Sequence, residues 1–97
     1  MPAMHYTIEW PDATRSVAYS PSLVMQDYFQ PGCDYPLAEF LRRVREATAI
    51  ANARVQAKFG FSCSRAGDQL LDTERRAALF AQQPDALVRI VAFGAAD

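Results

Sequence analysis

A long stretch of helical periodicity constrains the fold of this chain more than any other feature. Between Pro36 and Phe59, apolar residues recur on one stripe of a 3.6-residue helix, with Asp34 or Tyr35 at the cap position. The stripe consists of Leu37, Phe40, Leu41, Val44, Thr48, Ala51, Val55 and Phe59. At 1.5 Å per residue this helix is roughly 36 Å long, and Gly60 suits the left-handed residue that ends a helix. Such a helix needs a second layer to bury its apolar face.

A second amphipathic helix is predicted from Ser64 to about Gln83, where Pro84 breaks the pattern. Its apolar stripe consists of Ala66, Leu70, Thr73, Ala77, Phe80 and Ala81. Gly67 in its first turn costs the helix about 1 kcal/mol relative to alanine. We interpret this glycine as a place where another helix, a backbone or a ligand approaches closely.

Three segments have the pattern of strands. Met4 to Trp10 alternates between apolar and polar residues, which is typical of a half-buried strand. A turn at Pro11–Thr14 then predicts a hairpin partner from Arg15 to Tyr19, with Val17 and Tyr19 facing the core. The third strand is predicted from Leu87 to Phe93, and its pairing partner stays open.

These elements predict a single α+β domain over residues 1–97. We expect a two-layer sandwich in which two long helices cover one face of a three-stranded sheet, in the order β-β-α-α-β. A short helix through Leu23–Phe29 precedes the long ones. Because a seven-residue strand spans about 23 Å, the first long helix extends beyond the sheet by roughly 13 Å. The Leu23–Phe29 segment or another chain must cover that overhang.

Charge and composition argue against several classes of protein. The net charge is −1, from 10 basic and 11 acidic residues, so no overall field attracts nucleic acid or anionic lipid. The arginine run Arg42-Arg43-Val44-Arg45 is flanked by Glu39 and Glu46 and is interpreted as a solvated face. No apolar stretch approaches the ~18 residues of a membrane span, and no secretory signal is recognised, so we expect a cytoplasmic protein.

The cysteines give no metal pattern. Cys33 and Cys63 lie far apart in the sequence without a CxxC motif, so we predict two free thiols, no metal site and no cofactor.

The first candidate site is a thiol and anion site formed by Ser62, Cys63, Ser64 and Arg65. These residues open the second long helix, where unpaired N–H groups and the helix dipole can lower a thiol pKa or bind an anion. The alternative, which we favour, is that a serine caps the helix and Cys63 is a small buried side chain. His5, the one histidine, lies opposite the apolar stripe of its strand, so a Cys–His pair has no support.

Two further surfaces are weaker candidates. Ser20 and Ser22, around Pro21, could bind an anion at a second helix start, although a capping role is favoured. Ile50, Ala53 and Ala57 form a second apolar side on the long helix. Homo-oligomer formation through that side is one interpretation, and alanines on an exposed helix face are the favoured alternative.

Several short motifs share a joint order and spacing: Tyr19-Ser20-Pro21-Ser22-Leu23-Val24, Asp27-Tyr28, Tyr35-Pro36-Leu37 with Phe40, and Gly60-Phe61-Ser62-Cys63-Ser64. By these motifs the chain, from Met4 to Phe93, resembles a small family of bacterial nitrogen starvation response proteins. An Asp-Gly turn is expected where this chain has Asp12-Ala13, which leaves the turn type open. The resemblance implies a gene cluster with a nitrilase-like enzyme, a radical-type enzyme, an acetyltransferase and a flavin-dependent enzyme, but no site residue.

Three functions follow, in order of preference. The first is a small accessory or interaction protein of that metabolic cluster, without catalysis of its own and with a protein partner from the same cluster. The second is a thiol-based enzyme or sensor that uses Cys63. The third is a binder of a small anionic metabolite at the same helix start.

Overall fold

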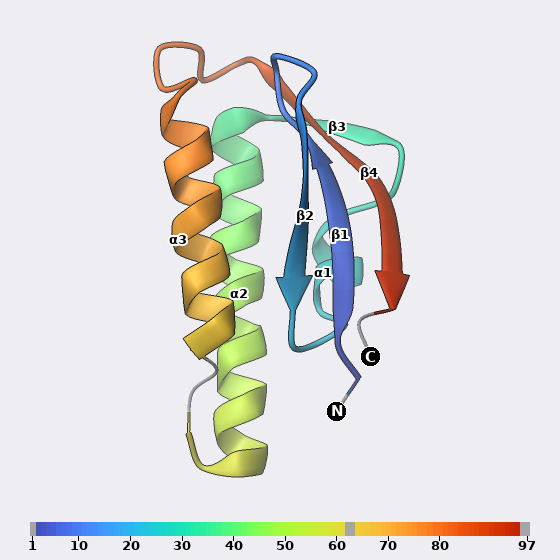
Figure 1. Cartoon of the computed structure of the whole chain (residues 1–97), viewed down its shortest axis with the longest axis vertical. Helices are drawn as coiled ribbons and strands as arrows, with labels where there is room; N and C mark the ends of the chain where they lie inside the picture. Colours follow the sequence, from blue (N-terminus) through green and yellow to red (C-terminus); the bar gives the residue numbers. More distant parts are fainter. Residues whose placement is uncertain (1, 62–63, 96–97) are drawn as a thin grey trace.

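The computed structural model describes residues 2–61 and 64–95 and confirms an α+β fold (Figure 1). In chain order the elements are β1 (Met4–Glu9), β2 (Arg15–Ser20), α1 (Met25–Tyr28), β3 (Cys33–Pro36), α2 (Leu37–Phe59), α3 (Ser64–Ala78) and β4 (Leu87–Ala95). The strands form one antiparallel sheet in the order β2-β1-β4-β3. The last strand therefore lies in the middle of the sheet, between β1 and β3.

The prediction of a three-stranded sheet is wrong because it lacks β3. Cys33 to Pro36 pairs with Ile90 to Leu87 at one edge of the sheet, where the sequence suggested only a helix cap. Main-chain bonds hold this short strand in place: Gly32 N–H donates to Ile90 O at 2.6 Å, and Leu37 N–H donates to Ala86 O at 2.9 Å. A four-residue edge strand that contains a proline is too short to show a clear alternation of apolar and polar residues. It forms because it pairs with β4, a partner that lies far away in the sequence.

The side-chain phase predicted for β2 is also wrong. Val17 is 63% exposed, whereas Ala18 is fully buried and Ser20 is 1% exposed. Ala18 pairs with Tyr6 and Ser20 with Met4, and directly opposite residues of an antiparallel pair share one face. Because the side-chain period of a strand is two, this shift by one residue moves every β2 side chain to the other face.

The hairpin turn itself is confirmed. Ala13 N–H donates to Trp10 O at 2.9 Å and Trp10 N–H donates to Thr14 O at 2.8 Å, while Ala13 is left-handed with φ 69°. Pro11 and Asp12 thus form a type I turn, and Ala13 takes the position after it that glycine prefers. Asp12 Oδ1 accepts bonds from both the N–H and the hydroxyl of Thr14, which holds the pKa of Asp12 below its ordinary value.

The first long helix agrees closely with its prediction. α2 ends at Phe59, and Gly60 follows in the left-handed conformation with φ 81°. Most of the predicted stripe is buried, but Phe59 is 51% exposed and lies beside Phe61 at the end of the helix. Phe59 is exposed because α2 extends past the end of the sheet, as Figure 1 shows.

The second long helix is shorter than predicted. α3 ends at Ala78, and the chain continues through turns with i to i+3 bonds such as Phe80 N–H to Ala77 O. These turns bring the ring of Phe80 over Trp10, with ring centroids 6.2 Å apart, and leave Ala81 exposed, contrary to its predicted place in the apolar stripe. A Cβ on Gly67 would meet no described atom within 4 Å outside its own helix. No other described segment therefore packs closely enough against this position to require a glycine.

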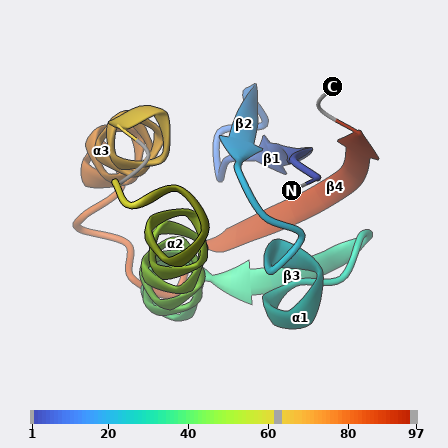
Figure 2. The same cartoon turned by 90° about the horizontal axis from the view of Figure 1, so that it is seen from below.

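The three helices lie around one face of the sheet. Figure 2 shows α1 and α2 on one side of the sheet and α3 beside the edge strand β2. An aromatic cluster fills the space between α2 and the sheet: Phe40 is fully buried and its ring lies 5.6 Å from Trp10 and 5.5 Å from Phe29. Burial in this core raises the pKa of Tyr6 well above its ordinary value.

α1 and α3 both contact α2. α1 lies against the first turns of α2, where Arg43 donates to Tyr28 O and the ring of Phe40 lies near that of Phe29, while Phe59 at the far end is exposed. Coverage of the overhang by the Leu23–Phe29 segment stays a prediction. Ile50 packs partly against the core, whereas Ala53 and Ala57 are exposed. Oligomer formation through these three residues stays a prediction.

Candidate functional site

The predicted thiol and anion site falls partly outside the described residues, because Ser62 and Cys63 are not among them. Ser64 and Arg65 are exposed at the start of α3. The guanidinium of Arg65 lies over the ring of Tyr19, 3.8 Å from its centroid. Arg65 thus contacts the edge strand β2, and the thiol and anion functions of this segment stay predictions.

The second predicted site, Ser20 and Ser22, lies in the interior. Both residues are buried, and Ser20 Oγ donates to Ser22 O at 2.7 Å. Ser22 Oγ accepts bonds from Val24 N–H at 3.3 Å and from Arg54 Nη1 at 2.9 Å. The serines therefore connect the loop after β2 to α2. The predicted capping role of Ser20 is wrong, because α1 begins at Met25 and no side chain caps it.

The histidine and the described cysteine of the sheet, His5 and Cys33, do not converge. His5 lies on the face away from the core, with its ring 6.1 Å from that of Tyr19. Cys33, a half-buried free thiol, lies on β3, and β4 separates it from the strand of His5. Among residues 2–61 and 64–95, no group of three or more His, Cys, Asp or Glu side chains could hold a metal ion.

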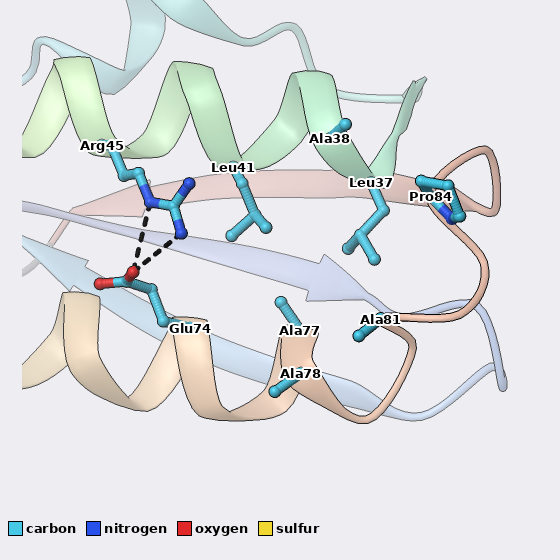
Figure 3. A pocket seen from close by; sticks show the side chains of 9 residues that line it. All are labelled: Leu37, Ala38, Leu41, Arg45, Glu74, Ala77, Ala78, Ala81 and Pro84. Atoms are coloured by element: carbon cyan, nitrogen blue, oxygen red, sulfur yellow. Dashed lines mark hydrogen bonds and ion pairs between the residues drawn. The ribbon is translucent and has the colours of Figure 1, made fainter.

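A groove between α2 and α3 is a surface pocket with a largely apolar lining (Figure 3). It has a volume of about 360 Å³ and is lined by Leu37, Ala38, Leu41, Arg45, Glu74, Ala77, Ala78, Ala81 and Pro84. Figure 3 shows Leu37 and Leu41 directed from α2 toward α3, whose alanines face them. The small side chains of α3 leave the groove open, because an alanine does not fill the space that a leucine would fill.

An ion pair borders this apolar groove. Arg45 Nε and Nη2 both donate to Glu74 Oε2, at 3.2 and 2.9 Å. Within the described part of the chain, Arg45 Nη1 and Glu74 Oε1 form no hydrogen bond, so the pair offers one unused donor group and one unused acceptor. The pair joins positions 29 residues apart, and no local pattern in the sequence predicts it. For the groove, the signal available in the sequence was that the apolar stripe of one helix contains leucines while that of the other contains alanines, which indicates unfilled space between the two helices.

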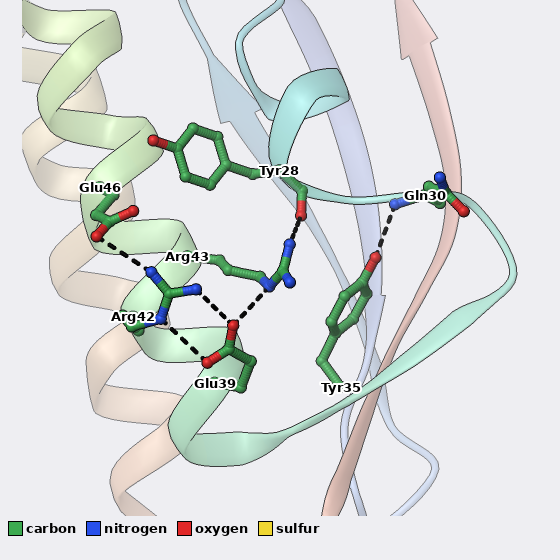
Figure 4. Close-up of polar contacts among 7 residues, drawn as sticks. All are labelled: Tyr28, Gln30, Tyr35, Glu39, Arg42, Arg43 and Glu46. Atoms are coloured by element: carbon green, nitrogen blue, oxygen red, sulfur yellow. Dashed lines mark hydrogen bonds and ion pairs between the residues drawn. The ribbon is translucent and has the colours of Figure 1, made fainter.

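A second pocket lies at the other side of α2 and is polar (Figure 4). Its volume is about 250 Å³, and its lining includes Tyr28, Tyr35 and Arg43. Arg43 Nη1 donates to Tyr28 O at 2.7 Å, and the guanidinium lies 5.2 Å from the ring centroid of Tyr35. The hydroxyl of Tyr35 accepts the N–H of Gln30 at 2.9 Å. These contacts attach the loop between α1 and β3 to α2.

The arginine run next to this pocket is neutralised. Arg42 donates to both oxygens of Glu39, at 2.6 and 3.0 Å, and to Glu46 at 3.2 Å, while Arg43 Nε donates to Glu39 at 2.9 Å. The bonds from Arg42, assisted by Arg43, lower the pKa of Glu39 to about 2, and Glu39 in turn raises the pKa of Arg42. With Arg45 paired to Glu74, every arginine of the run has a carboxylate partner. Arg42 and Arg45 are exposed, as expected for a solvated face, whereas Arg43 is half-buried against Tyr28 and Tyr35.

No described helix is both long and apolar enough to cross a membrane. The family model of nitrogen starvation-induced protein NitG matches residues 5–93. This match covers nearly the whole described structure and confirms the resemblance seen in the sequence. No curated protein and no solved structure matches the chain.

Proposed function

We propose that this chain, which belongs to the family of nitrogen starvation-induced protein NitG, is an accessory protein without catalysis of its own. In this proposal it binds a protein partner encoded in the metabolic gene cluster that the family resemblance implies. The groove between α2 and α3 is the observation that carries the proposal. The partner contributes a peptide segment that inserts one aliphatic side chain into the groove.

The chemistry of the groove supports a peptide as the occupant. Leu37, Leu41 and the alanines of α3 provide an apolar floor, on which burial of an aliphatic side chain contributes about 25 cal/mol per Å² of apolar area. Beside that floor, the Arg45–Glu74 pair leaves one donor and one acceptor unused by the described residues. A peptide unit carries one C=O and one N–H, which complement that donor and acceptor.

A matched pair of substitutions tests the proposal. Ala78 lies exposed in the groove and Ala53 lies exposed on the back of α2, so Ala78→Trp fills the groove and Ala53→Trp adds the same bulk elsewhere. The purified nitrilase-like enzyme implied by the family resemblance serves as the probe, with binding measured by calorimetry. We expect at least about tenfold weaker binding for Ala78→Trp and unchanged binding for Ala53→Trp.

Three outcomes would contradict the proposal. Equal binding by both variants would remove the groove as the docking site. No binding of the unmodified chain to the probe enzyme would remove the proposed partnership. Turnover of a cluster substrate by this chain alone would show that the protein is itself an enzyme.

A further inference from the structure

A row of alternating charges crosses the sheet on the face away from the helices. In the strand register, Arg15 of β2 lies opposite Glu9 of β1, Glu9 lies opposite Arg89 of β4, and Arg89 lies opposite Asp34 of β3. Directly opposite residues share one face of an antiparallel sheet. The four side chains thus form one line across all four strands, with charges in the order +, −, +, −.

Side-chain contacts order this row. Arg15 Nε donates to Glu9 Oε1 at 3.0 Å, and Arg89 donates to both oxygens of Asp34, at 2.7 and 3.3 Å. Arg89 lowers the pKa of Asp34, and Asp34 and Glu9 raise the pKa of Arg89. With strands ~4.8 Å apart, the row is about 14 Å long, so its charges occupy fixed positions on a rigid element.

The face around the row carries exposed apolar side chains, and the described helices leave it open except at Tyr19, whose ring lies under Arg65 of α3. The helices lie on the other side of the sheet and beside β2 (Figure 2). Val17 is 63% exposed on one side of the row and Leu87 is 54% exposed on the other. Thr7 and Ala92, which pair with each other next to the row, are small. Polar side chains thus cross an exposed surface that also contains apolar area available for burial.

We propose that this open sheet face binds a second copy of the chain, with the charge row setting the register of the dimer. A two-fold axis parallel to the strands, through the middle of the row, reverses the order of its charges. Each positive side chain then faces a negative one: Arg15 faces Asp34 of the second copy, and Glu9 faces its Arg89. A two-fold axis along the row would instead place each charge opposite itself, so the row selects one of the two arrangements.

The same axis places the neighbouring small residues together. Thr7 faces Ala92 of the second copy, which permits the two sheets to approach to the usual spacing of about 10 Å. Val17 and Leu87 then lose solvent contact on both copies, and their burial adds to the affinity. The charges contribute mainly specificity, because their desolvation offsets much of their attraction.

Reversal of the whole row tests this arrangement. The variant Arg15→Glu, Glu9→Arg, Arg89→Glu, Asp34→Arg keeps every pairing within the chain and is self-complementary in the same geometry. We expect the unmodified chain and this variant each to sediment as a dimer across a dilution series. When they are mixed with fluorescent labels of two colours, we expect no energy transfer between them, because in the proposed geometry, with the two-fold axis parallel to the strands, a mixed dimer places like charges opposite one another.

Two further variants, one single and one double, complete the test. We expect Glu9→Arg, which faces Arg89 of the second copy, to weaken the dimer at least about tenfold, with circular dichroism used to verify that the variant is folded. Ala53→Glu with Ala57→Glu, on the back of α2, should leave the dimer intact. A monomeric unmodified chain, free mixing with the reversed variant, or loss of the dimer through the α2 substitutions would overturn the proposal.

Discussion

The indole Nε1 of Trp10 donates a hydrogen bond of 3.0 Å to Oγ of Ser16. This bond connects β2 to the residue that follows β1 on the core side of the hairpin, where Ser16 lies directly opposite the buried Ile8. A buried tryptophan N–H needs an acceptor, and the serine hydroxyl supplies it. The bond therefore explains why a polar residue occupies a position that faces the core.

Replacement of Ser16 by alanine removes this acceptor. We expect Ser16→Ala to lower the free energy of unfolding by about 1–3 kcal/mol, because the indole N–H of Trp10 loses its only acceptor among the described side chains. Urea unfolding followed by the fluorescence of Trp10, the single tryptophan, measures the change. Leu79→Ala, at a side chain that is 78% exposed just after α3, is the control and should change the value by less than about 0.5 kcal/mol. Equal losses in both variants would contradict this role of Ser16.

The parts of the fold with strong local periodicity were predictable from the sequence. The α2 stripe, the left-handed Gly60 and the alternation of β1 each follow from residues close together in the chain. The phase of β2 was not predictable, since Val17 and Tyr19 look like its apolar face. Two short-range hydrogen bonds reverse that assignment, because the indole of Trp10 donates to Ser16 within the hairpin and Ser20 donates to Ser22 O just after the strand.

The candidate site was less accessible to sequence reasoning than the fold. The groove depends on how α2 and α3 are rotated relative to each other, and the 29-residue separation of Arg45 and Glu74 contains no local signal of that rotation. The charge row similarly depends on strand register, since β3 joins the sheet only through its bonds to β4. Both features come from non-local pairing, whereas the predicted helix-start sites were read from adjacent residues.

Two phenylalanines of α2 should differ strongly in their effect on stability. Phe40 is fully buried against Trp10 and Phe29, so we expect Phe40→Ala to lower the free energy of unfolding by about 3–5 kcal/mol. Phe59 is 51% exposed at the end of the same helix, and Phe59→Ala should cost less than about 0.5 kcal/mol. Urea titration of both variants measures the difference. A large loss for Phe59→Ala would mean that this ring is buried in solution.

The same substitution should have opposite effects at two glycines. Gly60 has φ 81°, a conformation that is unfavourable for alanine, so we expect Gly60→Ala to destabilise the protein by about 1 kcal/mol. Gly67 lies within α3, and a Cβ there would meet no described atom within 4 Å. Gly67→Ala should therefore stabilise the protein by up to about 1 kcal/mol through helix propensity. Thermal unfolding monitored by circular dichroism measures the direction of the stability change for both variants. A loss of stability in Gly67→Ala would contradict this prediction and would mean that a side chain at this position is unfavourable.

The ion-pair cluster at Glu39 should make stability depend on acidity. In the folded protein the pKa of Glu39 is about 2, mainly because Arg42 donates hydrogen bonds to its carboxylate. This value lies below the ordinary glutamate pKa of ~4.3 that applies in the unfolded chain. The unfolded state then binds more protons between these values, so the contribution of Glu39 is fully present above the unfolded pKa and is lost as the pH falls through the folded pKa. Glu39→Gln should unfold at lower urea than the unmodified chain at neutral pH, and this difference should shrink as the pH approaches about 2.

Because the Glu39 cluster is solvent-accessible, added salt should also reduce the difference in the urea midpoint. Asp68→Asn is the control, since Asp68 is exposed on α3 and has no ion pair with another described residue. Its urea midpoint should follow that of the unmodified chain at each pH. A Glu39→Gln difference that stays constant from neutral to acidic pH would show that the side chain acts through packing and not through its charge.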